Sequence, residues 1–96
     1  MNINEIKIKI KSAEPFLKEK FRVKKIGIFG SYVRGEQRKT SDVDILVEFF
    51  DDPSLFKFLD MENYLSDLLG IKVDLVMKNS LKPYIGEQIL SEVVYI

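Results

Sequence analysis

The spacing of hydrophobic residues changes along the chain, and each spacing predicts a type of secondary structure. The first segment is ambiguous, because isoleucines alternate with lysines over residues 6–10 as they would in a strand. The apolar positions then continue at helical spacing, and Lys and Glu are good helix formers. This longer stripe favours a helix over residues 3–21, which Pro15 is expected to kink or restart.

The remaining apolar segments predict three strands and two further helices. We expect the middle helix to begin at Asp51-Asp52-Pro53, with an aspartate as its cap and proline in its first turn. Gly70 is the expected residue just beyond its C-terminus. The predicted strands are 24–29, 43–49 and 71–77, with a short turn at 31–35, a polar loop at 36–41 and a last helix from Ser80 to about Val93.

The lengths of the connections predict how the strands pair. The second strand follows the first too closely for a helical crossover, so we expect that pair to be antiparallel. A helix separates the second strand from the third, which permits a parallel pair. The predicted fold class is therefore α+β, a small mixed β-sheet with helices packed on one face. The length predicts a single domain over residues 1–96.

Composition excludes several kinds of chemistry. Lys plus Arg is 15 and Asp plus Glu is 15, so no overall basic field attracts nucleic acid, and direct binding to it is not expected. The chain has no His and no Cys, which excludes histidine-dependent hydrolases, zinc sites built on those residues, and disulfides. Neither a membrane span nor a signal peptide is recognisable, so we expect a cytoplasmic protein.

Three aspartates, Asp42, Asp44 and Asp74, lie in predicted strands or at their start. Residues two apart on a strand point to one face, with Cα atoms roughly 6.5–7 Å apart. All three therefore share a face if both strands pack beneath the same helices. Converging carboxylates repel each other unless a cation neutralises them. Oxygen ligands without His or Cys suit Mg²⁺ or Mn²⁺. Two such ions about 3.5–4 Å apart would activate an attacking oxygen and stabilise a leaving one.

A glycine–serine pair, Gly30 and Ser31, ends the first predicted strand. Glycine lets the backbone approach a phosphate closely, and the serine hydroxyl and the N–H groups of the turn bind phosphate oxygens. Alone, the pair is commonly an ordinary turn, and Asp42 is equally consistent with a turn residue at a strand start. The combination is more specific: the pair is followed by ten residues and then by Asp42 and Asp44.

The sequence resembles the signature of the DNA polymerase β-like nucleotidyltransferase superfamily over residues 30–35 (Gly-Ser-Tyr-Val-Arg-Gly) and 41–45 (Ser-Asp-Val-Asp-Ile). The likeness is strongest to the minimal nucleotidyltransferases, which are the antitoxins of two-gene modules whose toxin is a HEPN-domain ribonuclease. It extends over nearly the whole chain, and Asp74 lies where the superfamily carries its third carboxylate. The resemblance implies a core like the polymerase β palm.

The resemblance also implies roles for individual residues. Asp42, Asp44 and Asp74 would be catalytic and would bind two Mg²⁺ ions, for which Mn²⁺ can substitute. Asp74 would also help to deprotonate the acceptor hydroxyl. Gly30 and Ser31 would hold the β and γ phosphates of ATP.

The family is known for transferring AMP from ATP to a tyrosine of its HEPN-type toxin, and we expect the same reaction and partners here. Larger relatives bind their acceptor with a second domain, for which this chain has no room. Two other functions fit the sequence: a non-catalytic antitoxin that neutralises its partner by complex formation, and a small-molecule nucleotidyltransferase of the aminoglycoside type. The sequence is compatible with either a homodimer or a hetero-oligomer. The residues that could form such an interface are Phe49, Phe50, Phe56 and Phe58.

Overall fold

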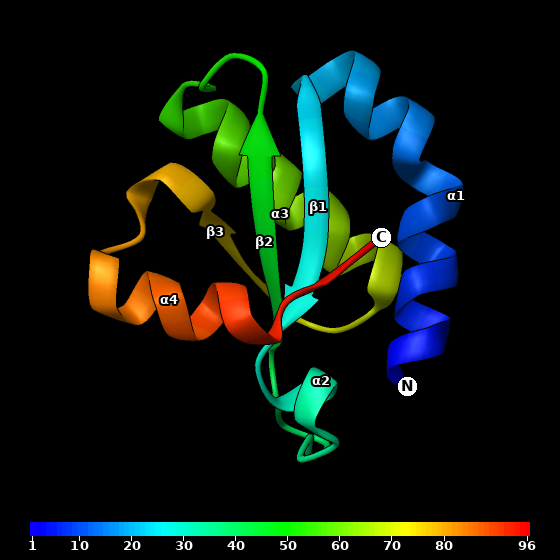
Figure 1. Ribbon diagram of the computed structural model, residues 1–96. Coiled ribbons are helices and arrows are strands. Elements are labelled where there is room, and N and C mark those ends of the chain that lie inside the picture. Colours follow the sequence, from blue (N-terminus) through cyan, green and yellow to red (C-terminus); the bar gives the residue numbers. More distant parts are fainter.

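The computed structural model describes residues 1–96 and contains one four-stranded sheet flanked by helices (Figure 1). The predicted order of elements is confirmed, and the structure adds a short 3-10 turn and a fourth strand near the C-terminus. The elements are α1 (Ile3–Phe21), β1 (Val23–Phe29), α2 (Ser31–Arg34), β2 (Val43–Phe49), α3 (Leu55–Leu69), β3 (Val73–Met77), η1 (Lys78–Ser80), α4 (Pro83–Glu92) and β4 (Val94–Tyr95).

The first segment is a helix, as its longer apolar stripe predicted. The side chain of Asn2 caps α1 by accepting a hydrogen bond from the backbone N–H of Glu5 at 3.0 Å. Pro15 lies inside α1 but does not end it, and the helix runs beside β1 and changes direction along its length (Figure 1). None of the helices is long and apolar enough to cross a membrane. The side of α1 that faces the core carries Ile6, Ile10, Ala13, Leu17 and Phe21.

The sheet has the strand order β3-β2-β1-β4. Strands β1 and β2 are antiparallel and β2 and β3 are parallel, as the connection lengths predicted. β3 begins at Val73, two residues later than expected. β4 pairs antiparallel with β1 through the partners Gly27–Tyr95 and Ile28–Val94. The sequence analysis did not predict β4, because a two-residue strand is too short to show a period.

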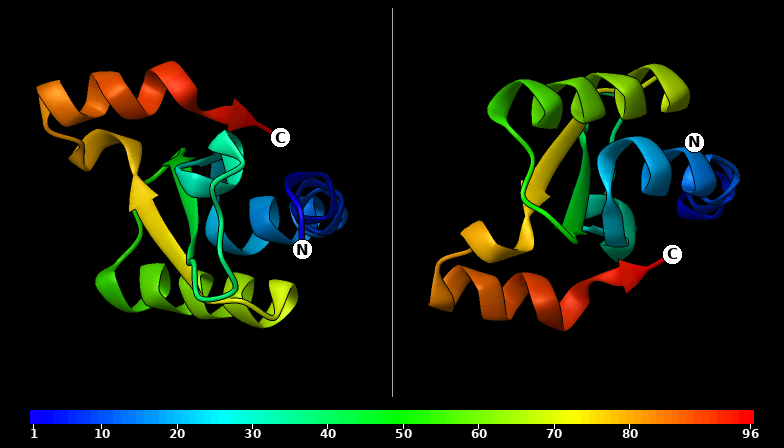
Figure 2. Two further views of the ribbon diagram at one scale, coloured as in Figure 1. Left: turned by 90° about the horizontal axis from the view of Figure 1, so that it is seen from below. Right: turned by 90° about the horizontal axis from the view of Figure 1, so that it is seen from above.

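The main core lies between one face of the sheet and helices α1 and α3. Val43, Ile45 and Val47 of β2 point into it and are completely buried. The expectation that the helices lie on one face holds for α1 and α3, whereas α4 lies on the other side of the sheet (Figure 2). Leu46, which has the opposite parity on β2, is also only 1% exposed. The second face is therefore partly covered.

The start of α3 differs from the sequence prediction. The helix begins at Leu55, and its cap is Ser54, whose Oγ accepts a hydrogen bond from the N–H of Lys57 at 3.2 Å. The carboxylate of Asp52 instead accepts from the side-chain amide of Asn79 at 3.0 Å. Any of several polar residues in this segment has the chemistry of a cap, and tertiary contacts selected the serine. The helix ends as expected, with Gly70 at φ 69°.

Candidate active site

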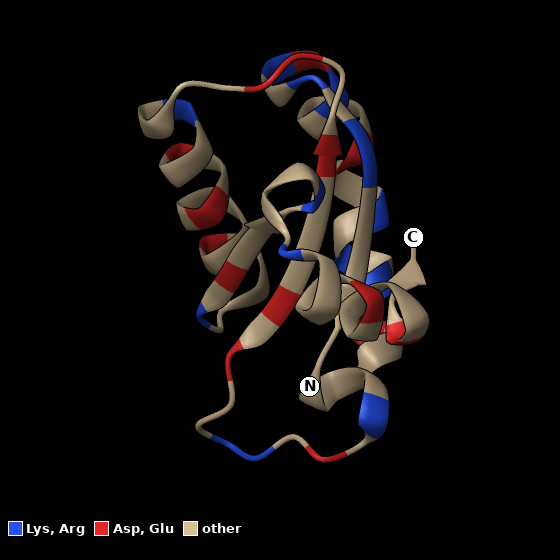
Figure 3. Cartoon of the chain, turned by 60° about the vertical axis from the view of Figure 1, so that its left-hand side comes forward, with Lys and Arg blue, Asp and Glu red and all other residues tan.

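Asp44 and Asp74 are brought together by the parallel pairing of β2 and β3. The two residues are direct Cα partners in the register, with Val43–Val73 on one side and Ile45–Leu75 on the other. Figure 3 shows acidic positions side by side on these adjacent strands. The sequence predicted the shared face, and the register now places the two aspartates at the same level of the sheet.

Asp42 lies just before β2 and is exposed. One of its carboxylate oxygens is 4.0 Å from Nζ of Lys72, and the two side chains are 45% and 78% exposed. An ion pair so open to solvent contributes little to stability. The exposed contact with Lys72 therefore constrains the Asp42 side chain only weakly.

The electrostatics of the site centre on Asp44, which is half-buried. Burial, followed by the negative charges of Asp74 and Asp42, raises the pKa of the Asp44 carboxyl from 3.8 to about 6. Arg34 opposes this rise, and Glu92 adds to it. A carboxylate that is destabilised by its carboxylate neighbours is a good ligand for a cation that would neutralise all of them.

The Gly30-Ser31 turn joins the end of β1 to α2 and lies against Asp44. Gly30 has φ 81° and ψ −151°, and a Cβ atom on it would overlap Oδ2 of Asp44. Only glycine permits both this backbone conformation and this close approach. Ser31 is the first residue of α2, and an α-helix leaves its first N–H groups without intrahelical acceptors. The turn therefore presents polar hydrogen atoms beside the carboxylates.

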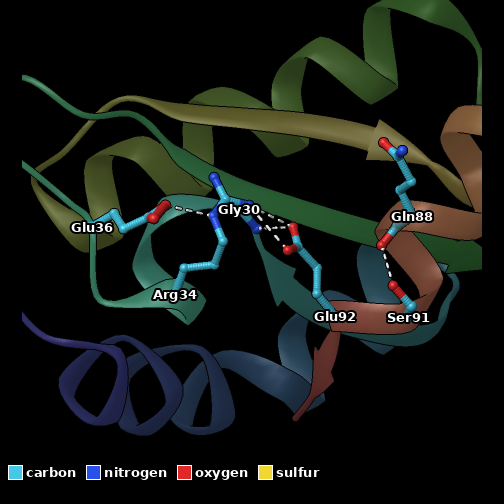
Figure 4. Close-up of polar contacts among 6 residues, drawn as sticks. All are labelled: Gly30, Arg34, Glu36, Gln88, Ser91 and Glu92. Atoms are coloured by element: carbon cyan, nitrogen blue, oxygen red, sulfur yellow. Dashed lines mark hydrogen bonds and ion pairs between the residues drawn. The ribbon is translucent and has the colours of Figure 1, made fainter.

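Glu92 was not among the residues predicted from the sequence, and it reaches this turn from the end of α4. Its Oε1 accepts a hydrogen bond from the Gly30 N–H at 2.9 Å, and both of its oxygens lie 3.0 Å from Nη1 of Arg34 (Figure 4). Glu36 accepts from Nε of Arg34 at 2.7 Å. The contacts with Glu36 and then Glu92 raise the pKa of the arginine. Glu92 is 62 residues from Gly30, and nothing local marks it.

The site offers the type of ligand that a divalent cation needs, although the side chains do not form a complete coordination sphere. The available donors are carboxylate oxygens, which Mg²⁺ and Mn²⁺ prefer. No three acidic side chains are already gathered at metal-binding separation. Mg²⁺ usually binds one or two carboxylates together with waters and substrate phosphates, so a cage made only of protein is not required. The site supplies carboxylates and a polar turn, and a nucleotide would supply the remaining oxygens.

Comparisons with known proteins identify the family and the fold of this chain. The family model described as "Nucleotidyltransferase domain" matches residues 10–96. The protein adenylyltransferase MntA of Thermococcus cleftensis is 52% identical over 96 residues, which are 100% of this chain and 97% of the relative. A solved structure provisionally assigned as a minimal nucleotidyltransferase superposes with a TM-score of 0.83 at 30% identity, covering 98% of this chain and 95% of the other.

A second solved structure, described as a toxin–antitoxin with AMP-PNP, superposes with a TM-score of 0.76 at 27% identity and covers 91% of this chain and 68% of the other. The match to the T. cleftensis protein covers nearly the full length of both sequences, and both solved structures share the fold of this chain. The chain therefore belongs to the nucleotidyltransferase domain family, among its protein adenylyltransferases.

Proposed function

We propose that this protein transfers AMP from ATP to a tyrosine hydroxyl of a HEPN-type toxin, as the antitoxin of a toxin–antitoxin module. The observation that carries the proposal is the pairing of Asp44 with Asp74 in adjacent parallel strands, next to the Gly30-Ser31 turn. The T. cleftensis relative is named as a protein adenylyltransferase, and the toxin–antitoxin structure contains AMP-PNP, an ATP mimic. Both support ATP as the donor and a toxin as the acceptor.

In the proposed site, Asp42, Asp44 and Asp74 hold two Mg²⁺ ions. When bound, Mg²⁺ neutralises the charge of the phosphates and lowers the pKa of an oxygen that it contacts. The raised pKa of Asp44 supports this assignment, because burial and the neighbouring carboxylates of Asp74 and Asp42 outweigh the opposing charge of Arg34, and a bound cation would offset them. Ser31 and the turn around Gly30 bind the β and γ phosphates and orient the leaving group.

The proposed reaction is an in-line displacement at the α-phosphorus of ATP. The acceptor oxygen forms a bond to this phosphorus while the bond to the bridging oxygen of the β-phosphate breaks, and pyrophosphate leaves with the electron pair. Asp74, which is exposed on β3, accepts the proton of the attacking hydroxyl. Positioning and charge stabilisation supply most of the acceleration in such transfers.

The first test is AMP transfer by the purified protein to its cognate toxin in the presence of Mg²⁺. Label from α-labelled ATP should appear on the toxin, whereas label from γ-labelled ATP should not. Asp44→Asn should lower the rate at least 100-fold, because it removes a metal ligand. Asp60→Asn is the matched control, since Asp60 is exposed on α3 and makes no ion pair.

Mass spectrometry of the labelled toxin then locates the modified side chain, which should be a tyrosine. Equal transfer by Asp44→Asn and the wild-type protein would overturn the proposed site. Neutralisation of the toxin by an Asp44→Asn variant that transfers no AMP would instead identify a non-catalytic antitoxin that acts by covering its partner.

A further inference from the structure

The C-terminal end of α4 contacts the glycine–serine turn directly, and we propose that Glu92 is a positioning residue of the nucleotide site. Its carboxylate contacts the Gly30 N–H and the Arg34 guanidinium and so orients the turn and the arginine for nucleotide binding. The proposal rests on the proposed function and extends it, because it makes the last residues of the chain part of the active site.

The contacts of Glu92 bring two separate parts of the turn to one carboxylate. Oε1 accepts from the backbone N–H of Gly30 at 2.9 Å and also lies 3.0 Å from Nη1 of Arg34. Oε2 lies 3.0 Å from the same Nη1. The Glu92 side chain is 27% exposed, whereas that of Arg34 is 48% exposed. Charge-assisted hydrogen bonds of this length to a partly buried carboxylate are stronger than those of an open surface pair.

Both partners of Glu92 need an external contact to stay in place. Gly30 adopts φ 81° and ψ −151°, a conformation that glycine reaches readily but only as one of many, so contacts are needed to select it. Its carbonyl accepts hydrogen bonds from the N–H groups of Val33 and Arg34 at 3.1 and 3.2 Å, and Glu92 secures its N–H. The long side chain of Arg34 can adopt many rotamers, and only contacts with other residues restrict it to one of them. Glu92 thus completes the fixation of the turn.

Glu92 is itself fixed by the strand that follows it. β4 begins two residues later, at Val94, and pairs with β1 at Ile28, just before the glycine–serine turn. The N–H of Ile96 also donates to the carbonyl of Ile26 at 3.0 Å. The same central strand therefore supports both the turn and the segment that carries Glu92, which keeps their separation constant.

A rival role for Glu92 is competition, in which its carboxylate occupies donors that phosphates require. Glu92 does occupy the Gly30 N–H, but the contacts of Arg34 with Glu36 and Glu92 use only Nε and Nη1, which favours positioning for the arginine. Nη2 makes no hydrogen bond to another residue, so its N–H groups are available to a further acceptor. The arginine is therefore oriented by the two carboxylates and retains capacity for a further anion.

The test measures the Kd of a non-hydrolysable ATP analogue with Mg²⁺, together with KM and kcat for AMP transfer and the Tm of each variant. Glu92→Ala should raise the Kd and KM for nucleotide about tenfold, because small misplacement of binding groups is costly. Glu92→Gln should raise the Kd and KM by a smaller factor, since its amide oxygen can still accept a hydrogen bond from the Gly30 N–H. Glu87→Ala on the same helix is the control, because Glu87 is exposed and makes no hydrogen bond or ion pair.

A double-mutant cycle with Arg34→Ala separates positioning from general stability. If Glu92 acts through Arg34, the effect of Glu92→Ala on Kd shrinks in the Arg34→Ala background. An unchanged Kd with a lower Tm would show a structural role only, and a lower Kd would show competition; either result overturns the inference. A wild-type protein that binds no nucleotide would refute the proposed function, whereas a wild-type Kd in Glu92→Ala would refute this inference alone.

Discussion

At the scale of single residues, the site depends on how closely the backbone at Gly30 approaches Asp44. No other residue type fits there, since a Cβ would overlap the carboxylate and φ is 81°. The close approach places the glycine–serine turn next to Asp44 without any intervening side chain. Gly35 also has a positive φ, 71°, but a Cβ on it would meet no atom within 4 Å.

This contrast yields a prediction for two alanine variants. Gly30→Ala should reduce AMP transfer at least 100-fold, because the new methyl group displaces the Asp44 carboxylate or the turn. Gly35→Ala should cost only about 1–2 kcal/mol of backbone strain and leave transfer nearly unchanged. Transfer kinetics and urea unfolding of both variants check this. Equal loss of transfer in the two variants would show that the contact between Gly30 and Asp44 is unimportant.

At the scale of elements, α3 joins the core through one side only. Met61, Leu65 and Leu69 recur every four residues and are buried against the sheet and α1. The first turn of the helix is different, since Leu55 and Phe56 are 69% and 81% exposed. The helix therefore contributes to stability through its middle and C-terminal turns. At its N-terminal end, Leu55 and Phe56 extend into solvent, whereas Phe58 is partly buried against the core.

Two leucine truncations on α3 test this division. Leu65→Ala should lower the free energy of unfolding by about 3 kcal/mol, because it removes buried methyl groups and leaves a cavity. Leu55→Ala should change it by less than about 0.5 kcal/mol, since the side chain is already in water. Urea titrations followed by circular dichroism measure both values. A cost for Leu55→Ala comparable to that for Leu65→Ala would contradict the described packing.

At the scale of the whole molecule, the acidic site is assembled by the sheet at the expense of stability. Asp42 precedes β2, Asp44 lies within it and Asp74 comes from β3 after the intervening helix. Folding buries Asp44 and brings these charges together, so the folded state holds a proton on Asp44 more tightly than the unfolded chain does. The pKa of Asp44 is about 6 in the folded protein, against 3.8 for the ordinary group.

The sign of the resulting pH dependence follows from linkage. Because the folded pKa is the higher one, the contribution of Asp44 to the free energy of unfolding increases as pH falls from about 6 toward 4, and it is lost as pH rises through 6. In metal-free buffer, Asp44→Asn should therefore stabilise the protein at pH 7 by roughly 1 kcal/mol, after allowance for solvent screening. At pH 4.5 this advantage should be smaller.

Urea unfolding of the wild-type protein and of Asp44→Asn at both pH values, with a chelator present, measures this difference. Asp67→Asn serves as the control, because Asp67 is exposed on α3 and lies outside the acidic site. An Asp44→Asn advantage that is the same at pH 4.5 and pH 7 would show that folding does not perturb the Asp44 carboxyl.

The sequence by itself determined the order of the elements, the strand directions and the shared face of Asp44 and Asp74. Each of these depends on periodicity or on connection length, which are local properties of the chain. The long apolar stripe likewise identified α1 in spite of Pro15. The signature around Gly30, Ser31 and the aspartates identified the family, which the comparisons confirm.

Only the tertiary structure decided the register, the side of the sheet on which α4 lies, and the role of the chain end. The pairing of Asp44 with Asp74 depends on hydrogen bonds between distant strands, and β4 is too short to have a period of its own. Glu92 resembles any solvated residue at a helix end until β4 brings it to Gly30. Contacts across 62 residues are set by packing of the whole molecule, which no local pattern records.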